Sequence, residues 1–175
     1  GTKTKRHPTR TRETGDQMST TNKPEAPKGI DPRGPRFGAA ITAVLMVLVI
    51  YFSLAAETIN LALGIMIFSV TMFVFGTALG PAKHPYSYIY KYLVRPRLKP
   101  PTALENATPV HFAQFVGLIV TGTGLVLHLL GVAYALPVAA AAAFTAAFLN
   151  AVFAYCLGCQ MYLGLKRIGV IPSKS

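Results

Sequence analysis

The chain has few charged residues, no tryptophan and little cysteine. Only 13% of its 175 residues are charged and 52% are hydrophobic, whereas an average soluble domain has about 25% charged residues. The two cysteines are too few for the disulfide framework of a small secreted protein, or for a metal site within one chain. The composition therefore predicts an integral membrane protein, with no metal ion and no cofactor.

Acidic residues are also scarce: six stand against seventeen Lys and Arg, for a net charge of +11. In a soluble protein such an excess would point to nucleic acid. Here nine basic residues precede Phe37, five lie within 81–109 and three follow Leu165, so none falls in a long apolar run. This distribution is that of a membrane topology. We therefore expect anionic lipid headgroups as partners, and no nucleic acid.

Four long apolar runs predict an all-α membrane domain over 37–165, built as a bundle of four transmembrane helices. The first run, 37–56, has about 20 residues, which at 1.5 Å per residue cross a hydrocarbon core of about 30 Å. It is also too long for the apolar region of a signal peptide. The other three helices are predicted over 58–79, 110–130 and 136–162.

The basic residues also predict which side of the membrane each end of the bundle faces. The turn around Glu57 and the connection 131–135 contain no Lys or Arg. With the N-terminus in the cytoplasm, all seventeen basic residues lie on the cytoplasmic side, as the positive-inside rule requires. The expected topology thus has both termini on the cytoplasmic side of the membrane. The connection 80–109, which contains four alternating tyrosines, is then a cytoplasmic loop at the headgroup interface.

The ends of the chain are polar. Residues 1–36 are basic and without apolar periodicity, which predicts a disordered tail. Met18 and the Ser-Thr-Thr after it resemble a translation start, so residues 1–17 are expected to be a non-native extension. Residues 166–175 are expected to form a short cytoplasmic tail.

Cys156 and Cys159 are the main candidate catalytic residues. On a helix their spacing places the two sulfur atoms one turn apart, close enough to bridge after local distortion. A bare C-x-x-C is compatible with redox chemistry, with metal binding and with no chemistry. Near the C-terminus of an unbroken helix the dipole disfavours a thiolate, whereas a helix break at Gly158 would favour one. Both arrangements are compatible with the sequence.

Two further residues are candidates for polar neighbours of the cysteines. His111 begins the third predicted helix at the depth where the fourth ends, because consecutive helices are antiparallel, and a histidine beside a thiol can accept its proton. Gln114 lies one turn further on. An interfacial position is the competing interpretation for His111. Gln114, Thr121 and His128 also share one helix face, which indicates either a packed interface or a polar path for a proton or small solute.

Five motifs occur in order along the chain: Asp31-Pro32-Arg33-Gly34-Pro35-Arg36-Phe37, Leu79-Gly80-Pro81 with His84-Pro85-Tyr86, Arg95-Pro96-Arg97-Leu98 with Pro100-Pro101, Phe112-Ala113-Gln114, and Cys156-Leu157-Gly158-Cys159. Over residues 30–165 they resemble a bacterial membrane family, common in actinobacteria, called domain of unknown function 4395. The resemblance implies a multi-pass protein of the bacterial inner (plasma) membrane with a C-x-x-C near its C-terminus.

The resemblance also bears on chemistry. Genes for thioredoxin-like proteins and rhodanese-type sulfurtransferases often neighbour those of the family, which implies thiol or sulfur handling. The family tends to have arginine where His111 stands and an acidic residue where Gln160 stands. The first departure weakens His111 as a catalytic partner. The second weakens acid-assisted chemistry beside Cys159.

The leading functional hypothesis is a membrane thiol protein, and whether it is an enzyme is left open. Cys156 and Cys159 would cycle between dithiol and disulfide, or carry a persulfide, in exchange with a thioredoxin-like or rhodanese-type sulfurtransferase partner. One alternative is a non-enzymatic scaffold or accessory subunit of a larger membrane complex. Another is a small-solute conduit along the Gln114 stripe, which requires an oligomer.

Overall fold

The computed structural model describes residues 29–172, which contain four helices long and apolar enough to cross a membrane. These helices are α1 (Arg33–Ser53), α2 (Ile59–Leu79), α4 (Ala107–Leu129) and α5 (Ala135–Phe153). The prediction of an all-α fold with four such helices is confirmed. The proposed translation start at Met18, the expected extension 1–17 and the rest of the tail up to residue 28 lie outside the described residues.

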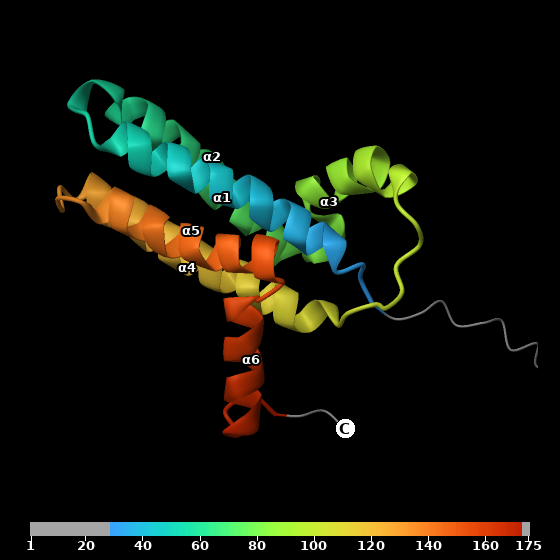
Figure 1. Cartoon of the computed structure of the whole chain (residues 1–175). Helices are drawn as coiled ribbons and strands as arrows, with labels where there is room; N and C mark the ends of the chain where they lie inside the picture. Colours follow the sequence, from blue (N-terminus) through green and yellow to red (C-terminus); the bar gives the residue numbers. More distant parts are fainter. Residues whose placement is uncertain (1–28, 173–175) are drawn as a thin grey trace, which may run out of the picture.

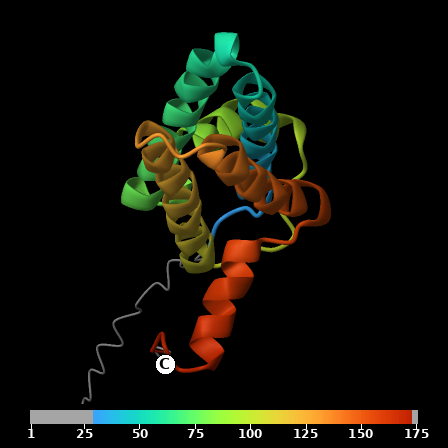
Figure 2. The same cartoon turned by 90° about the vertical axis from the view of Figure 1, so that its left-hand side faces the viewer.

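The four long helices form two antiparallel hairpins that pack side by side (Figure 1). The 3₁₀ helix η1 (Ala56–Thr58) joins α1 to α2, and residues 130–134 join α4 to α5. Both turns lie at the same end of the bundle, which faces the viewer in Figure 2. The opposite end holds the connection between α2 and α4 and the last helix, α6 (Leu157–Arg167).

Small and flexible apolar side chains form the core between the hairpins. Six of them are completely buried: Met46, Val49, Ala62, Met66, Leu136 and Ala140. Ala139, Ala143 and Ala147 repeat every four residues and form a buried stripe along α5. Gly124 of α4 packs directly on Ala139. Such small residues let helix backbones approach closely, which is how helices associate within lipid.

Large apolar side chains cover the outside of the bundle. Val44, Leu61, Ile119 and Val138, one from each long helix, are all more than half exposed. In water an apolar surface of this extent would drive aggregation or association. Around a bundle whose helices are long enough to span the hydrocarbon core, the same side chains contact lipid tails. The surface is therefore consistent with a multi-pass membrane protein.

The connection predicted as a loop over 80–109 is largely helical. Gly80, with φ of 81°, ends α2 and is followed by Pro81, which begins a 3₁₀ turn. The short helical elements in order are η2 (Pro81–Lys83), α3 (Pro85–Ile89), the π-helical η3 (Tyr90–Val94) and η4 (Arg95–Arg97). An irregular stretch then leads to Asn106, whose side chain caps α4 by accepting a hydrogen bond from the Thr108 N–H at 2.9 Å.

The first described residues are held by this connection. Ile30 and Glu105 exchange two backbone hydrogen bonds of 2.9 Å each. The Tyr90 hydroxyl donates to Asp31 Oδ2 at 3.1 Å, and burial, the largest cause, together with Asp31 raises the pKa of Tyr90. Residues 29–36 therefore differ from the predicted disordered tail, and α1 begins at Arg33 instead of Phe37.

The predicted fourth helix, 136–162, is divided into α5 and α6. Ala154 adopts the left-handed conformation with φ of 55°, and the N–H of Tyr155 returns to the Leu149 carbonyl at 3.1 Å. A left-handed residue often ends a helix, although here alanine rather than glycine occupies that position. Arg36 of α1 donates to the Ala151 carbonyl at 3.4 Å and so satisfies part of the last turn. Beyond the break, α6 runs across the direction of the bundle (Figure 1).

Candidate functional site

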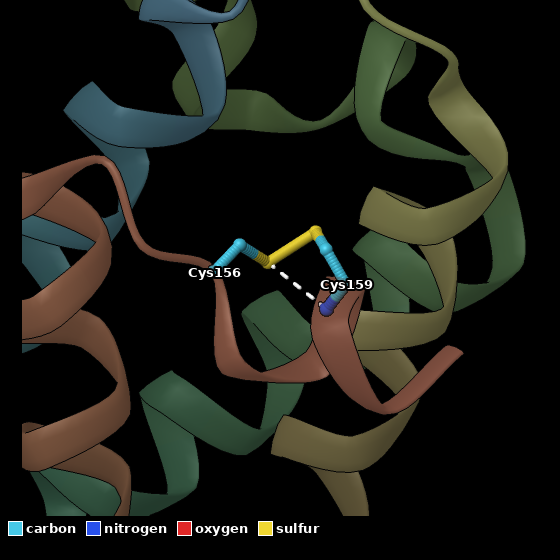
Figure 3. The surroundings of a disulfide bond; sticks show 2 residues. All are labelled: Cys156 and Cys159. Atoms are coloured by element: carbon cyan, nitrogen blue, oxygen red, sulfur yellow. Dashed lines mark hydrogen bonds between the residues drawn. A yellow bond between two sulfur atoms is a disulfide. The ribbon is translucent and has the colours of Figure 1, made fainter. Parts of the chain in front are cut away.

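Cys156 and Cys159 form a disulfide at the start of α6 (Figure 3). Cys156 is the N-cap of this helix, and its sulfur accepts a hydrogen bond from the Cys159 N–H at 3.2 Å. The pair therefore lies at the positive end of a helix dipole, where a sulfur released as thiolate is stabilised. The chain adopts the broken-helix arrangement, with the break at 154–156 instead of at Gly158.

The disulfide is held against α4. Gly158, between the two cysteines, is buried and packs on Ala113. One turn further along α6, the Tyr162 ring lies 5.7 Å from the Phe112 ring, centroid to centroid. These contacts fix α6 relative to the bundle and hence fix the position of the disulfide.

A cavity of about 370 Å³ lies between the four long helices beside the disulfide, and both cysteines line it. Gln114 of α4, Asn150 of α5 and Tyr86 of α3 contribute polar side chains. Small residues form part of the remaining wall, among them Gly34, Gly38, Gly117, Ala113, Ala143, Ala146 and Ala147, beside larger apolar residues and the charged Arg36 and Glu105. Pockets of ~300–1,000 Å³ with apolar walls and a few polar groups are typical of small-ligand sites.

His84 holds α3 against the end of α2. Its Nδ1 accepts a hydrogen bond from the Tyr86 N–H at 3.1 Å, so the ring proton is on Nε2, which donates to the Met72 carbonyl at 3.0 Å. Burial lowers the pKa of His84, and the ring is therefore neutral at pH 7. The side chain also lines the cavity.

Two buried polar atoms of the cavity lining have no hydrogen-bond partner among the described residues. They are the hydroxyl of Tyr86, a residue only 7% exposed, and Oε1 of Gln114. Burial raises the pKa of Tyr86 to about 12, so the hydroxyl keeps its proton at pH 7. A buried polar group without a partner costs ~1–3 kcal/mol. Two residues of the lining thus hold one donor and one acceptor that have no partner in the described part of the chain.

Gly76 of α2 makes room for the polar side chains at this end of the cavity. A Cβ atom at this position would lie 2.6 Å from Gln114 Oε1 and 2.9 Å from His84 Cδ2. The missing side chain lets both groups pack on the α2 backbone. Glycine is therefore required here for space, since the residue lies inside α2 with ordinary helical geometry.

The structure brings together three of the four predicted site residues. Cys156, Cys159 and Gln114 line one cavity. His111 instead turns toward α2, where its Nε2 lies 2.5 Å from the Thr77 carbonyl oxygen, and it does not line the cavity. The histidine that does so is His84, which sequence reasoning missed although it belongs to one of the five motifs. The proline after it favours extended backbone at His84, which suits a helix cap.

The remaining members of the predicted polar stripe lie apart from the cavity. Thr121 is completely buried and donates to the Gly117 carbonyl of its own helix at 2.7 Å. Neither Thr121 nor His128 lines the cavity. Within residues 29–172, no group of three or more His, Cys, Asp or Glu is arranged to hold a metal ion.

The part of the chain that carries the cavity and the disulfide matches one known family. The family model described as "Domain of unknown function (DUF4395)" matches residues 30–167, which include the four long helices and α6. The chain belongs to this family, as the five motifs indicated. Neither the search of curated proteins nor that of solved structures found a match.

Proposed function

We propose that this chain is a multi-pass protein of the bacterial plasma membrane, with both termini and the disulfide on the cytoplasmic side. The support is the charge difference between the two ends of the bundle. The end with the two helix turns has Glu57 and no basic residue, whereas all nine basic residues among 29–172 lie at the other end. The positive-inside rule then assigns the second end to the cytoplasm.

Anionic lipid headgroups are the proposed partners of the cytoplasmic end. Tyr88 and Tyr92 are exposed there, and the Lys91 ammonium lies 5.8 Å from the Tyr92 ring centroid. The exposed Lys166 and Arg167 end α6, which crosses the direction of the bundle as a helix lying along the membrane surface does.

Cysteine labelling in intact cells tests this topology. In a background with both native cysteines replaced by serine, a Glu57→Cys variant should react with a membrane-impermeant maleimide. A Lys166→Cys variant should react only after permeabilisation. The reverse pattern would show that the chain has the opposite orientation.

We further propose that Cys156 and Cys159 cycle between disulfide and dithiol in exchange with a thioredoxin-like or rhodanese-type protein. The observation that supports this most is the position of Cys156 as N-cap of α6, bonded to the Cys159 N–H. A thiolate formed at this position is stabilised by the amide and by the helix dipole. A stabilised thiolate is both a better leaving group and more abundant at neutral pH.

The proposed exchange is balanced in atoms and electrons. A thiolate of the partner attacks one sulfur of the disulfide, and the other sulfur leaves as a thiolate. The partner's second thiolate then attacks the partner's sulfur in the mixed disulfide and releases the reduced pair. Two electrons pass to Cys156 and Cys159, and the partner gains a disulfide. In the persulfide form, a thiolate of Cys156 or Cys159 attacks the outer sulfur of the partner's persulfide. That sulfur is transferred to the attacking cysteine, and the partner's own cysteine sulfur leaves as a thiolate.

Trapping of mixed disulfides tests this function. Cys156→Ser and Cys159→Ser variants of the full chain, expressed in native membranes, should each leave one thiol unable to resolve a mixed disulfide. We expect covalent capture of a thioredoxin-like or rhodanese-type protein, reversed by dithiothreitol.

The matched control carries both serine substitutions and a new cysteine at the exposed Met161 of the same helix. Equal capture by this control would show that any accessible thiol on α6 reacts, which would contradict the proposal. Full complementation of a deletion strain by the double serine variant under oxidative or sulfur stress would also contradict it.

A further inference from the structure

We propose that the cavity beside the disulfide binds the ring of a membrane-dissolved quinone, which accepts the two electrons that the cysteine pair takes from its thiol partner. The inference rests on the proposed thiol exchange and adds the oxidant that restores the disulfide. Four properties of the cavity support it: its depth, its walls, its unpartnered polar atoms and the disulfide in its lining.

The cavity extends from the disulfide into the middle of the bundle. Its lining includes Thr42, Ser69 and Ala142, each of which lies about halfway along its helix. In a bundle that spans the bilayer, these residues are at the depth of the hydrocarbon core. A carrier dissolved in the lipid reaches this depth, whereas a water-soluble protein partner does not.

The walls suit a flat apolar ring. The alanines of α5 present methyl groups in place of long side chains, and larger apolar residues complete the lining: Met72, Phe73, Leu157 and Met161. Smooth, mostly apolar walls with a few oriented polar groups are the general form of a site for a small organic ligand. A volume of about 370 Å³ lies within the range for such ligands.

The two unpartnered atoms match both redox states of a quinone. The Tyr86 hydroxyl is a donor, and a quinone carbonyl oxygen accepts such a bond. Gln114 Oε1 is an acceptor, and a hydroquinone hydroxyl donates to it. Both atoms are covered by protein atoms, so a bound ring supplies the missing partners once the two side chains rotate toward it. An acyl chain in the same space supplies neither bond.

The disulfide in the lining matches a quinone in electron count. The reduced pair and the quinone give the disulfide and the hydroquinone. Two S–H bonds break, one S–S bond forms, the ring gains two electrons, and each quinone oxygen gains one proton. The charged residues of the lining are Arg36 and Glu105, one of each sign.

Binding is tested separately from electron transfer. The full chain with both cysteines replaced by serine is reconstituted in lipid nanodiscs and titrated with ubiquinone-1 by calorimetry. We expect saturable binding of one molecule per chain, weakened at least about tenfold by Gln114→Ala and by Tyr86→Phe, the size of one lost hydrogen bond.

Thr121→Ala is the control, because Thr121 is buried on α4, the helix of Gln114, but does not line the cavity. A cavity-filling variant, Ala146→Phe, should abolish binding while the chain keeps its helical circular dichroism spectrum. Absence of saturable binding, or equal affinity in all variants, would overturn the quinone proposal even if partner trapping succeeds.

Electron transfer is tested with the native cysteines. The reduced protein in nanodiscs is mixed with ubiquinone-1 without oxygen, and quinone loss and free thiols are followed together. We expect one disulfide per quinone consumed, at a rate lowered at least about tenfold in Gln114→Ala. Quinone binding without disulfide formation, or rates equal to those of a free dithiol, would overturn the proposed electron acceptor. Failure of partner trapping with quinone reduction intact would count against the thiol partner alone.

Discussion

Gly158 of α6 packs against the backbone of Ala113 in α4 so closely that a Cβ atom at position 158 would lie 2.5 Å from the Ala113 Cα. This contact lies between the two cysteines of the disulfide. One of the two residues between the cysteines is therefore also the residue that packs this part of α6 on the bundle. Glycine is needed at position 158 for this close approach and not for its backbone conformation, because Gly158 does not have a positive φ.

Replacement of Gly158 by alanine should displace α6. The conflict is with a backbone atom, which cannot move aside as a side chain can, so we expect a loss of about 1–3 kcal/mol in the free energy of unfolding. The measurement is unfolding of the purified protein in mixed micelles. Gly164→Ala is the control, since nothing lies within 4 Å of a Cβ there, and we expect it to be neutral or slightly stabilising. Equal effects of the two substitutions would contradict the proposed contact.

Cys156 should be the more reactive thiol of the reduced pair. In a Cys159→Ser variant, the Cys156 sulfur keeps its position at the N-cap and the hydrogen bond from the N–H of residue 159. We expect alkylation by iodoacetamide at pH 7 about tenfold faster than that of Cys159 in a Cys156→Ser variant. In guanidinium the two rates should converge. Faster alkylation of Cys159 in the folded protein would refute the N-cap assignment.

Ala154→Gly should stabilise the protein. Ala154 has φ of 55°, and the left-handed conformation costs a residue with a Cβ roughly 1–2 kcal/mol. We expect a net gain of about 1 kcal/mol, because glycine also loses more chain entropy on folding. Ala147→Gly, within α5, is the control and should destabilise. If Ala154→Gly destabilises to the same extent as the control, the helix does not break at this residue.

The stability of the protein should fall as the pH is lowered from 7 toward 5. Burial lowers the pKa of His84 below its ordinary value of 6.5, so the unfolded state binds a proton at a higher pH than the folded state does. Stability from the neutral ring is thus complete above pH 6.5 and is lost as the pH falls through the folded-state pKa.

The thermal midpoint in detergent, measured across this range, checks the sign of that dependence. A His84→Asn variant keeps an acceptor for the Tyr86 N–H but has no ring to protonate. Its midpoint should change less between pH 7 and 5 than that of the unmodified chain. An unchanged pH dependence in this variant would assign the effect to another group.

Much of the architecture was predictable from local patterns. Each long helix coincides with an apolar run, and residues such as Pro81 mark its end, because hydrophobicity and helix-breaking residues act over a few neighbours. The break before α6 was not predictable in this way. Alanine has the highest helix propensity, so Ala154 carries no local stop signal. The helix ends there with support from Arg36, which lies 115 residues away in sequence.

The candidate site shows the same division. C-x-x-C and Gln114 stand out in the sequence, but their common cavity depends on small residues contributed by four helices, and no single helix shows that pattern. His84, and not the predicted His111, lines the cavity for a similar reason, since carbonyl groups of α2 hold both rings in place.

The sequence by itself determined the family, the four helices and the segregation of charge to one end, because each of these is written in contiguous residues. Only the tertiary structure decided that the cysteines begin a helix instead of ending one. It also decided that the Tyr86 hydroxyl and Gln114 Oε1 are buried without partners among residues 29–172. Both depend on contacts between residues far apart in sequence, and packing selects those contacts among the many that the same pattern allows.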